Sequence, residues 1–206
     1  MTPTKQILDV VVNETKKMVK LYKRDNKKEL LYAEYWITDK EITVHTGKVG
    51  REGRVKEYYL NKDFETEGDF VSFFRKKFES QGYSEILDEE ICFLAVQFPM
   101  KSLKGNKRDY WLRDKVTEYL NEELGWAGLG HIDGFDMGEL ISFPQKYALT
   151  IFCIVVDEAK GIKIIKRCLR YSDLDYDKVK IASRPYLSDI GFQLKYSAKK
   201  DDFFSI

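Results

Sequence analysis

The chain has 206 residues, of which 43% are hydrophobic, including 13 Phe, 13 Tyr and 3 Trp. This much apolar and aromatic material can close a sizeable core, which excludes a wholly disordered or fibrous chain. The 35 Lys and Arg residues nearly balance the 34 Asp and Glu residues. The resulting net charge of +1 argues against a surface built entirely for nucleic acid, although a local basic patch is compatible with it.

The cysteines, the histidines and the hydropathy pattern indicate a cytoplasmic protein without a cofactor. Cys92, Cys153 and Cys168 have no CxxC spacing and are typical of buried free thiols. His45 and His131 are too few and too far apart in sequence to suggest a zinc site. The N-terminus lacks a signal-peptide cleavage site, and no apolar run approaches the roughly 20 residues that span a bilayer. We therefore expect a reducing, cytoplasmic compartment and no membrane contact.

Residues 1–28 are predicted to form an N-terminal amphipathic helix. Apolar residues between positions 4 and 24 recur at the i, i+3, i+4 and i+7 spacing of one helix face. Most lysines of this stretch lie on the opposite side, and the polar run RDNKK ends the pattern. The simplest interpretation is a helix docked on the rest of the protein with its lysines in water; contact with a membrane or nucleic acid is the alternative.

Residues 29–86 are predicted to form a small antiparallel sheet followed by a helix. The alternating segment LLYAEYW, a TDKE turn, and the segments ITVHTGKV and VKEYYL are typical of strands. We expect residues 45–60 to form a hairpin with bends at Gly47 and Gly50. The helix is expected to end at Gly82.

Four phenylalanines at helical spacing within this helix are expected to be buried against the sheet: Phe70, Phe73, Phe74 and Phe78.

Residues 91–184 are predicted to form a ferredoxin-like domain. The expected helices are residues 109–124 and the segment EAKGIKIIKRCLRYS, each with one apolar face. The expected strands are ICFLAVQF, ELISF, KYALTIFCIVVD and KVKIAS. Their order, β-α-β-β-α-β, matches the ferredoxin-like split unit, so the fold class is predicted as α+β. The mixed pattern of the C-terminal tail, residues 185–206, indicates no element.

Residues 29–83, about a quarter of the chain, resemble a WGR domain. The match consists of AEYWIT, then TVHTGKVGREGRVKEYYL, then a Phe-rich helix closing on FESQGY. The residues in matching places are Gly47, Val49, Gly50, Gly53, Lys56, Gly82 and Tyr83. Two positions depart from the family's pattern: Thr46 replaces the signature aromatic residue, and Lys48 replaces its Arg.

The resemblance implies a module that binds nucleic acid or protein. WGR domains occur in nuclear poly(ADP-ribose) polymerases, where they contact DNA ends and neighbouring domains, and in many bacterial proteins. A glycine-rich turn exposes N–H groups, and adjacent cations can meet phosphate oxygens. The candidate binding residues are Lys48, Arg51, Arg54 and Lys56, which we expect to project near one another, with Trp36 as a stacking surface. Because Lys does not replace a bidentate Arg, the departures favour a protein partner; the alternative is a hairpin whose charges are solvated.

A second candidate site is the glycine-rich stretch GLGHIDGFDMGE. It gathers His131, Asp133, Asp136 and Glu139, which could bind a divalent metal or perform acid–base chemistry. The spacing matches neither an EF-hand loop nor a phosphate-binding glycine loop. A bent loop before a strand is the favoured interpretation.

The second predicted helix of this domain also carries a basic stripe, formed by Lys163, Lys166, Arg167 and Arg170. It is interpreted as a solvated face, with an acidic partner as the alternative.

No hydrolase, metalloprotease or nucleotide-triphosphatase motif occurs in the chain. We therefore expect a non-enzymatic cytoplasmic binding protein, of a composition that suits a small bacterial protein, with a protein or nucleic acid as its partner. An immunity or antitoxin-type protein that blocks a toxin's active site is the alternative. A metal-dependent enzyme centred on residues 131–139 ranks lowest.

Overall fold

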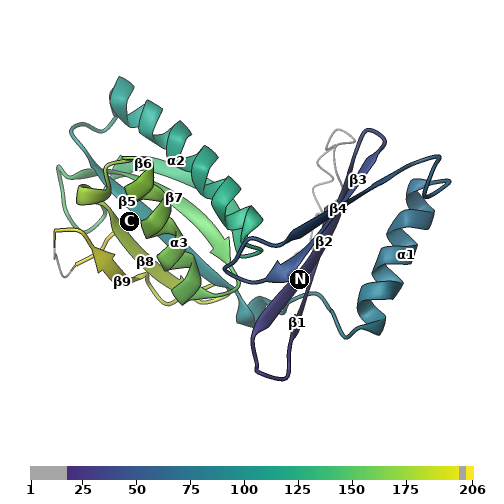
Figure 1. Ribbon diagram of the computed structural model, residues 1–206. Coiled ribbons are helices and arrows are strands. Elements are labelled where there is room, and N and C mark those ends of the chain that lie inside the picture. The colour runs from purple at the N-terminus through teal and green to yellow at the C-terminus, as the bar shows by residue number, and fades with distance from the viewer. Residues whose placement is uncertain (1–17, 200–202) are drawn as a thin grey trace, which may run out of the picture.

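The computed structural model describes residues 18–199 and 203–206, which form two antiparallel sheets (Figure 1). The N-terminal sheet has the order β1-β2-β3-β4 and contains β1 (Val19–Arg24), β2 (Leu30–Thr38), β3 (Glu41–Lys48) and β4 (Arg54–Tyr59). The C-terminal sheet has the order β6-β7-β5-β8-β9 and contains β5 (Cys92–Met100), β6 (Gly130–Glu139), β7 (Tyr147–Val155), β8 (Lys180–Pro185) and β9 (Gln193–Ser197). The α-helices are α1 (Glu67–Ser80), α2 (Lys107–Trp126) and α3 (Glu158–Tyr171). The predicted α+β class is confirmed.

The C-terminal unit follows the expected order β-α-β-β-α-β from β5 to β8, and β9 adds an edge strand from the tail. Its core lies between the sheet and the two helices α2 and α3, whose apolar faces pack on alternate residues of β5 and β7. None of the helices in the described part of the chain is long and apolar enough to cross a membrane.

The predicted N-terminal helix is wrong for residues 19–24, which form β1 and pair with β2 from Val19↔Tyr35 to Arg24↔Leu30. Figure 1 shows the N-terminal sheet standing between α1 and the C-terminal unit. Leu21 therefore packs into the core under α1, while Tyr22 packs into the core of the C-terminal unit. Burial on both faces removes the alternation that marks a strand in sequence. Residues 1–17 of the expected helix lie outside the described residues.

The hairpin expected over residues 45–60 is confirmed by the antiparallel register of β3 and β4. Gly50 lies in its turn with a φ of +87°, a conformation that glycine adopts without strain. Gly47, however, lies within β3 rather than at a bend. A Cβ at Gly47 would lie 2.9 Å from the Tyr32 hydroxyl oxygen, so this glycine allows close packing rather than a change of direction.

Helix α1 covers the outer face of the N-terminal sheet. It begins at a capping box, in which the Thr66 side chain accepts a hydrogen bond from the Asp69 backbone and Asp69 bonds back to the Thr66 backbone. Phe70, Phe74 and Phe78, spaced by four residues, are buried as expected.

Phe73 departs from this expectation, because its side chain is 50% exposed. It lies at the edge of the buried helix face, where its ring contacts the rings of Phe64 and Phe74.

The N-terminal sheet and the C-terminal unit meet at the end of α2. Helix α2 closes in a Schellman motif: Gly128 has a φ of +62°, and the Leu129 N–H donates to the Leu124 carbonyl over 2.9 Å. The N-terminal sheet caps three successive carbonyl oxygens at this helix end, where the helix itself supplies no partner. The donors are the Tyr32 hydroxyl to Trp126 (3.2 Å), the Gly50 N–H to Ala127 (2.8 Å) and the Tyr22 hydroxyl to Gly128 (3.3 Å). These bonds place the β3–β4 turn beside α3.

A basic groove as the candidate functional site

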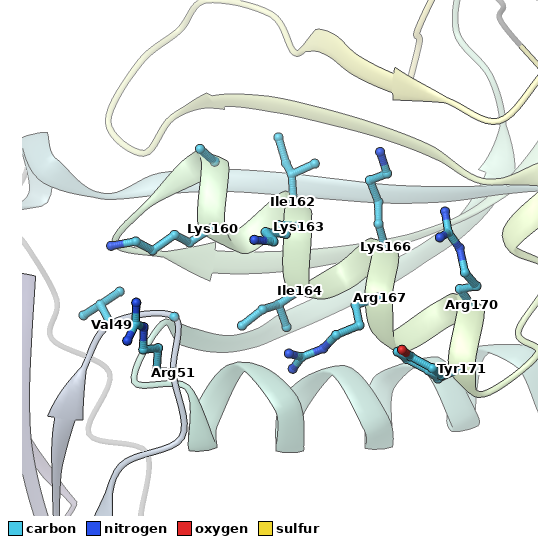
Figure 2. A pocket seen from close by; sticks show the side chains of 12 residues that line it. Val49, Arg51, Lys160, Ile162, Lys163, Ile164, Lys166, Arg167, Arg170 and Tyr171 are labelled. Carbon is cyan, nitrogen blue, oxygen red and sulfur yellow. The ribbon is translucent and has the colours of Figure 1, made fainter.

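A groove with a volume of about 640 Å³ lies between the β3–β4 turn and α3 (Figure 2). Six cationic side chains line it, and they define what we call the basic groove: Arg51, Lys160, Lys163, Lys166, Arg167 and Arg170. Figure 2 shows Arg51 and Lys160 together at one end and Arg170 and Tyr171 at the other. The groove therefore lies between a turn of the N-terminal sheet and a helix of the C-terminal unit.

The amphipathic sequence of α3 produces the basic side of the groove. Asp157 caps the helix by accepting a hydrogen bond from the Lys160 N–H over 3.0 Å. The apolar side chains of Ile165 and Leu169 are fully buried against the sheet. The cations occupy the remaining face, which a helix covering a sheet must leave open.

The β3–β4 turn closes one end of the groove. A Cβ at Gly50 would lie 2.7 Å from Cδ of Lys160, which shows how closely the turn approaches the first turn of α3. A side chain at this position would displace the flexible Lys160 side chain, and the φ of +87° would strain its backbone, so the backbone conformation is the main reason for glycine.

Carboxylates neutralise only part of the charge in the groove. Lys160 pairs with Asp157 over 3.1 Å, and Arg167 pairs with Glu123 over 2.6 Å. The other four cations form no salt bridge with any residue in the described part of the chain: Arg51, Lys163, Lys166 and Arg170. Their positive charge remains available to an anionic partner.

Two tyrosines hold two of these cations in place. The Arg170 guanidinium donates to the Tyr176 hydroxyl over 2.8 Å and lies 4.7 Å from its ring centre, while Lys166 Nζ lies 3.8 Å from the centre of the Tyr196 ring. Tyr196 donates to the Tyr176 hydroxyl over 2.8 Å, and this hydrogen bond, supported by Arg170, lowers the pKa of Tyr176. Aromatic faces orient cations without cancelling their charge.

The predicted binding residues are divided between two places. Arg51 lines the basic groove, whereas Arg54 and Lys56 line a different hollow of about 450 Å³ between β4 and α1. Lys48 forms an exposed ion pair with Glu29. The cations therefore do not project together as expected, because pairing with β3 directs Arg54 and Lys56 toward α1.

Trp36 lies on the opposite face of the N-terminal sheet from Lys56. It pairs with Thr43, whereas Lys56 pairs with Val44, and consecutive residues of a strand point to opposite sides. Trp36 is half-buried and lines neither hollow. The structure therefore separates this side chain from the cations that it was expected to assist.

The expected glycine-rich loop is a strand. His131, Asp133, Asp136 and Glu139 all lie in β6, at the edge of the C-terminal sheet, and the residues of the expected strand ELISF that follow Glu139 form a turn. Gly130 allows β6 to pair closely with β7, because a Cβ at this position would lie 1.8 Å from the Ile154 carbonyl oxygen of β7. Instead of a bend, the register shifts between Ile132 and Gly134, which is a β-bulge.

This strand does not bring the four polar side chains to one point. At about 3.3 Å per residue, His131 and Glu139 are roughly 26 Å apart along β6. Within the described residues, no three His, Cys, Asp or Glu side chains gather in a way that could hold a metal ion. A metal-dependent site centred on residues 131–139 is therefore not supported.

A buried polar network, which sequence reasoning missed, lies where the two units meet. Nδ1 of His45 lies 2.6 Å from Oε1 of Glu34, and its Nε2 lies 2.9 Å from the Tyr32 hydroxyl. Lys20 Nζ lies 2.8 Å from Oε2 of Glu34. The residues Tyr32, His45 and Glu34 are at most 3% exposed, and the Tyr32 hydroxyl also contacts the Trp126 carbonyl of α2. The network therefore connects the two units and is closed to solvent at these three residues.

The chemistry of the basic groove is that of anion binding. The twelve residues that line it include no carboxylate, histidine, cysteine or hydroxyl nucleophile other than the phenol of Tyr171. Sequence reasoning identified Arg51 and the basic stripe of α3 separately, but it missed Lys160 and Tyr171. Comparison with known protein families, with curated proteins and with solved structures finds no match for this chain.

Proposed function

We propose that this protein is a non-enzymatic nucleic-acid-binding protein whose basic groove holds the phosphate backbone. The observation that carries the proposal is the convergence of Arg51 and five cations of α3 on one groove, four of the six without a carboxylate partner among the described residues. Phosphate contacts from Lys and Arg supply most of the affinity of a sequence-independent nucleic-acid interface.

The length of the groove supports contact with more than one phosphate. Lys160 and Arg170 are ten residues apart, which corresponds to about 15 Å along the axis of α3. Phosphates of one DNA strand rise by roughly 3.4 Å each along the duplex axis. The planar guanidinium groups of Arg51, Arg167 and Arg170 suit bidentate contacts with phosphate oxygens.

The WGR-like segment contributes to this proposal through its glycine turn. The WGR domains that residues 29–83 resemble contact DNA ends and neighbouring domains in nuclear poly(ADP-ribose) polymerases, and here Arg51 of the resembling segment lines the groove. The remaining cations come from the C-terminal unit. We also propose a bacterial, cytoplasmic location. The three cysteines are free thiols, which agrees with a reducing compartment.

Fluorescence anisotropy with a labelled oligonucleotide at several salt concentrations tests the proposal. The logarithm of affinity should fall linearly with the logarithm of salt concentration, with a slope of about −0.9 per duplex phosphate or −0.7 per single-strand phosphate. The double variant Arg51→Ala/Lys163→Ala should make that slope shallower by about one to two units.

The matched control is Arg54→Ala/Lys56→Ala, which removes the same amount of charge from the other hollow. It should leave affinity and slope close to those of the unmodified protein. A loss of binding in the control alone would move the interface to the hollow beside α1. No measurable binding to any oligonucleotide at about 150 mM salt would favour the alternative, an acidic protein such as a toxin partner.

A further inference from the structure

We infer that the basic groove receives a single strand and that Tyr171 stacks on one of its bases, an inference that rests on the proposed function. Tyr171 is the last residue of α3 and lines the groove, with its side chain 84% exposed. Figure 2 shows its ring on the same side of α3 as Arg167, whereas the Arg170 side chain extends away from the ring. An exposed aromatic ring among cations combines the two elements of a single-strand site, which are a stacking surface and a positive track.

The aromatic ring distinguishes a single strand from a duplex. In a duplex the faces of the bases are covered by their neighbours, so a side chain outside the helix reaches only the base edges and the backbone. A single strand can turn an unstacked base onto a tyrosine, and this contact tolerates any sequence because every base has a π-face.

The size of the groove also favours a single strand over a duplex. Its volume of about 640 Å³ falls within the range of roughly 300–1,000 Å³ that is typical of pockets for small molecules. Such a space suits one or two nucleotides, whereas a duplex, whose major groove alone is about 12 Å wide, could only lie across the opening.

Two cations of the groove, on the side of α3 away from the Tyr171 ring, are already oriented. Arg170 is held by the Tyr176 hydroxyl and ring, and Lys166 by the Tyr196 ring. A phosphate of the same strand that reaches Lys166 or Arg170 would therefore meet charges whose side chains lose little freedom on binding. The strand would run along α3 from Tyr171 toward the contact between Gly50 and Lys160, where the groove closes.

The test compares Tyr171→Ala and Tyr171→Phe by anisotropy, with a labelled ten-nucleotide oligothymidylate and with a mixed-sequence duplex of equal length. Tyr171→Ala should weaken single-strand binding by about 5- to 150-fold, the equivalent of one stacked base. Its salt slope should not change, because the ring neutralises no phosphate. Tyr171→Phe should bind like the unmodified protein, and duplex binding should change by less than about twofold in both variants.

The outcomes separate this inference from the proposed function. Normal single-strand affinity of Tyr171→Ala would overturn the stacking role, while a salt slope still reduced by Arg51→Ala/Lys163→Ala would sustain the proposed function. Tighter binding of the duplex than of the single strand would also overturn the inference. A nucleoside monophosphate that binds as tightly as the oligonucleotide would identify a free nucleotide as the ligand instead of a strand. If neither oligonucleotide binds, the proposed function fails and this inference fails with it.

Discussion

Two polar regions lie near the junction of the sheets, and they differ in how their charge is balanced. In the buried network, Glu34 is paired with both His45 and Lys20, and His45 also contacts Tyr32. In the basic groove, most cations are open to solvent without a carboxylate partner among the described residues. Buried polar groups need hydrogen-bond or charge partners within the chain, whereas exposed charges are hydrated and can bind a ligand. The first region is therefore structural, and the second is available for binding.

The largest expected effect is a difference in stability between a variant of the buried network and a variant of the basic groove. His45→Ala leaves the Glu34 carboxylate buried without one of its partners, which should lower the free energy of unfolding by about 3–5 kcal/mol. Lys163→Ala in the basic groove should change it by less than about 0.5 kcal/mol, because the side chain makes no salt bridge with another described residue. Urea unfolding of both variants measures the difference. Equal stabilities would show that the network does not support the fold.

A glycine substitution tests the close packing at the junction. A Cβ at Gly128 would lie 2.1 Å from the Tyr32 ring, and the backbone there has a φ of +62°. Gly128→Ala should therefore lower the free energy of unfolding by about 1–3 kcal/mol. Gly125→Ala is the matched control, since a Cβ at that position of α2 meets no atom within 4 Å. It should raise stability by up to about 1 kcal/mol, and an equal loss in both variants would contradict the packing argument.

The buried network should also make stability depend on acid pH. Burial alone raises the pKa of Glu34, but the hydrogen bond with His45 and the charge of Lys20 outweigh it and lower that pKa below 4.5. A carboxyl whose pKa is lower in the folded state stabilises the fold above its unfolded pKa, and this contribution disappears as pH falls through the folded pKa. Urea unfolding between about pH 3 and 6 should therefore show a shallower pH dependence for Glu34→Gln. Superimposable pH profiles would contradict this role.

The smallest effect concerns the ion pair at the rim of the groove. Arg167 and Glu123 are both about half exposed, so Arg167→Ala should lower the free energy of unfolding by only about 0.2–1 kcal/mol. The difference should vanish at about 1 M salt, where surface charges are screened. Thermal melting at low and high salt measures it, and a salt-independent loss would show that Arg167 acts through packing rather than charge.

Local sequence pattern alone predicted the helices that bury one face and the strands that are apolar along most of their length. In the C-terminal unit, the strands β5 and β7 are continuous apolar runs, and α2 and α3 carry one apolar face each, so their existence and order followed from local pattern. The hairpin of β3 and β4 was likewise predicted from its glycines and flanking strands. β1 and β6 were missed, because β1 is buried on both faces and β6 is a polar, glycine-rich edge strand.

The sequence by itself therefore determined most local elements and the chemistry of the two basic segments, because hydrophobic period and charge are properties of neighbouring residues. Only the tertiary structure joined Arg51 to α3, more than a hundred residues further along the chain, and directed Arg54 and Lys56 to another hollow. The physical reason lies at the end of α2, where the Gly50 N–H and two tyrosine hydroxyls satisfy carbonyls that would otherwise be unpaired. Those long-range hydrogen bonds place the turn beside α3, and they cannot be predicted from short-range sequence patterns.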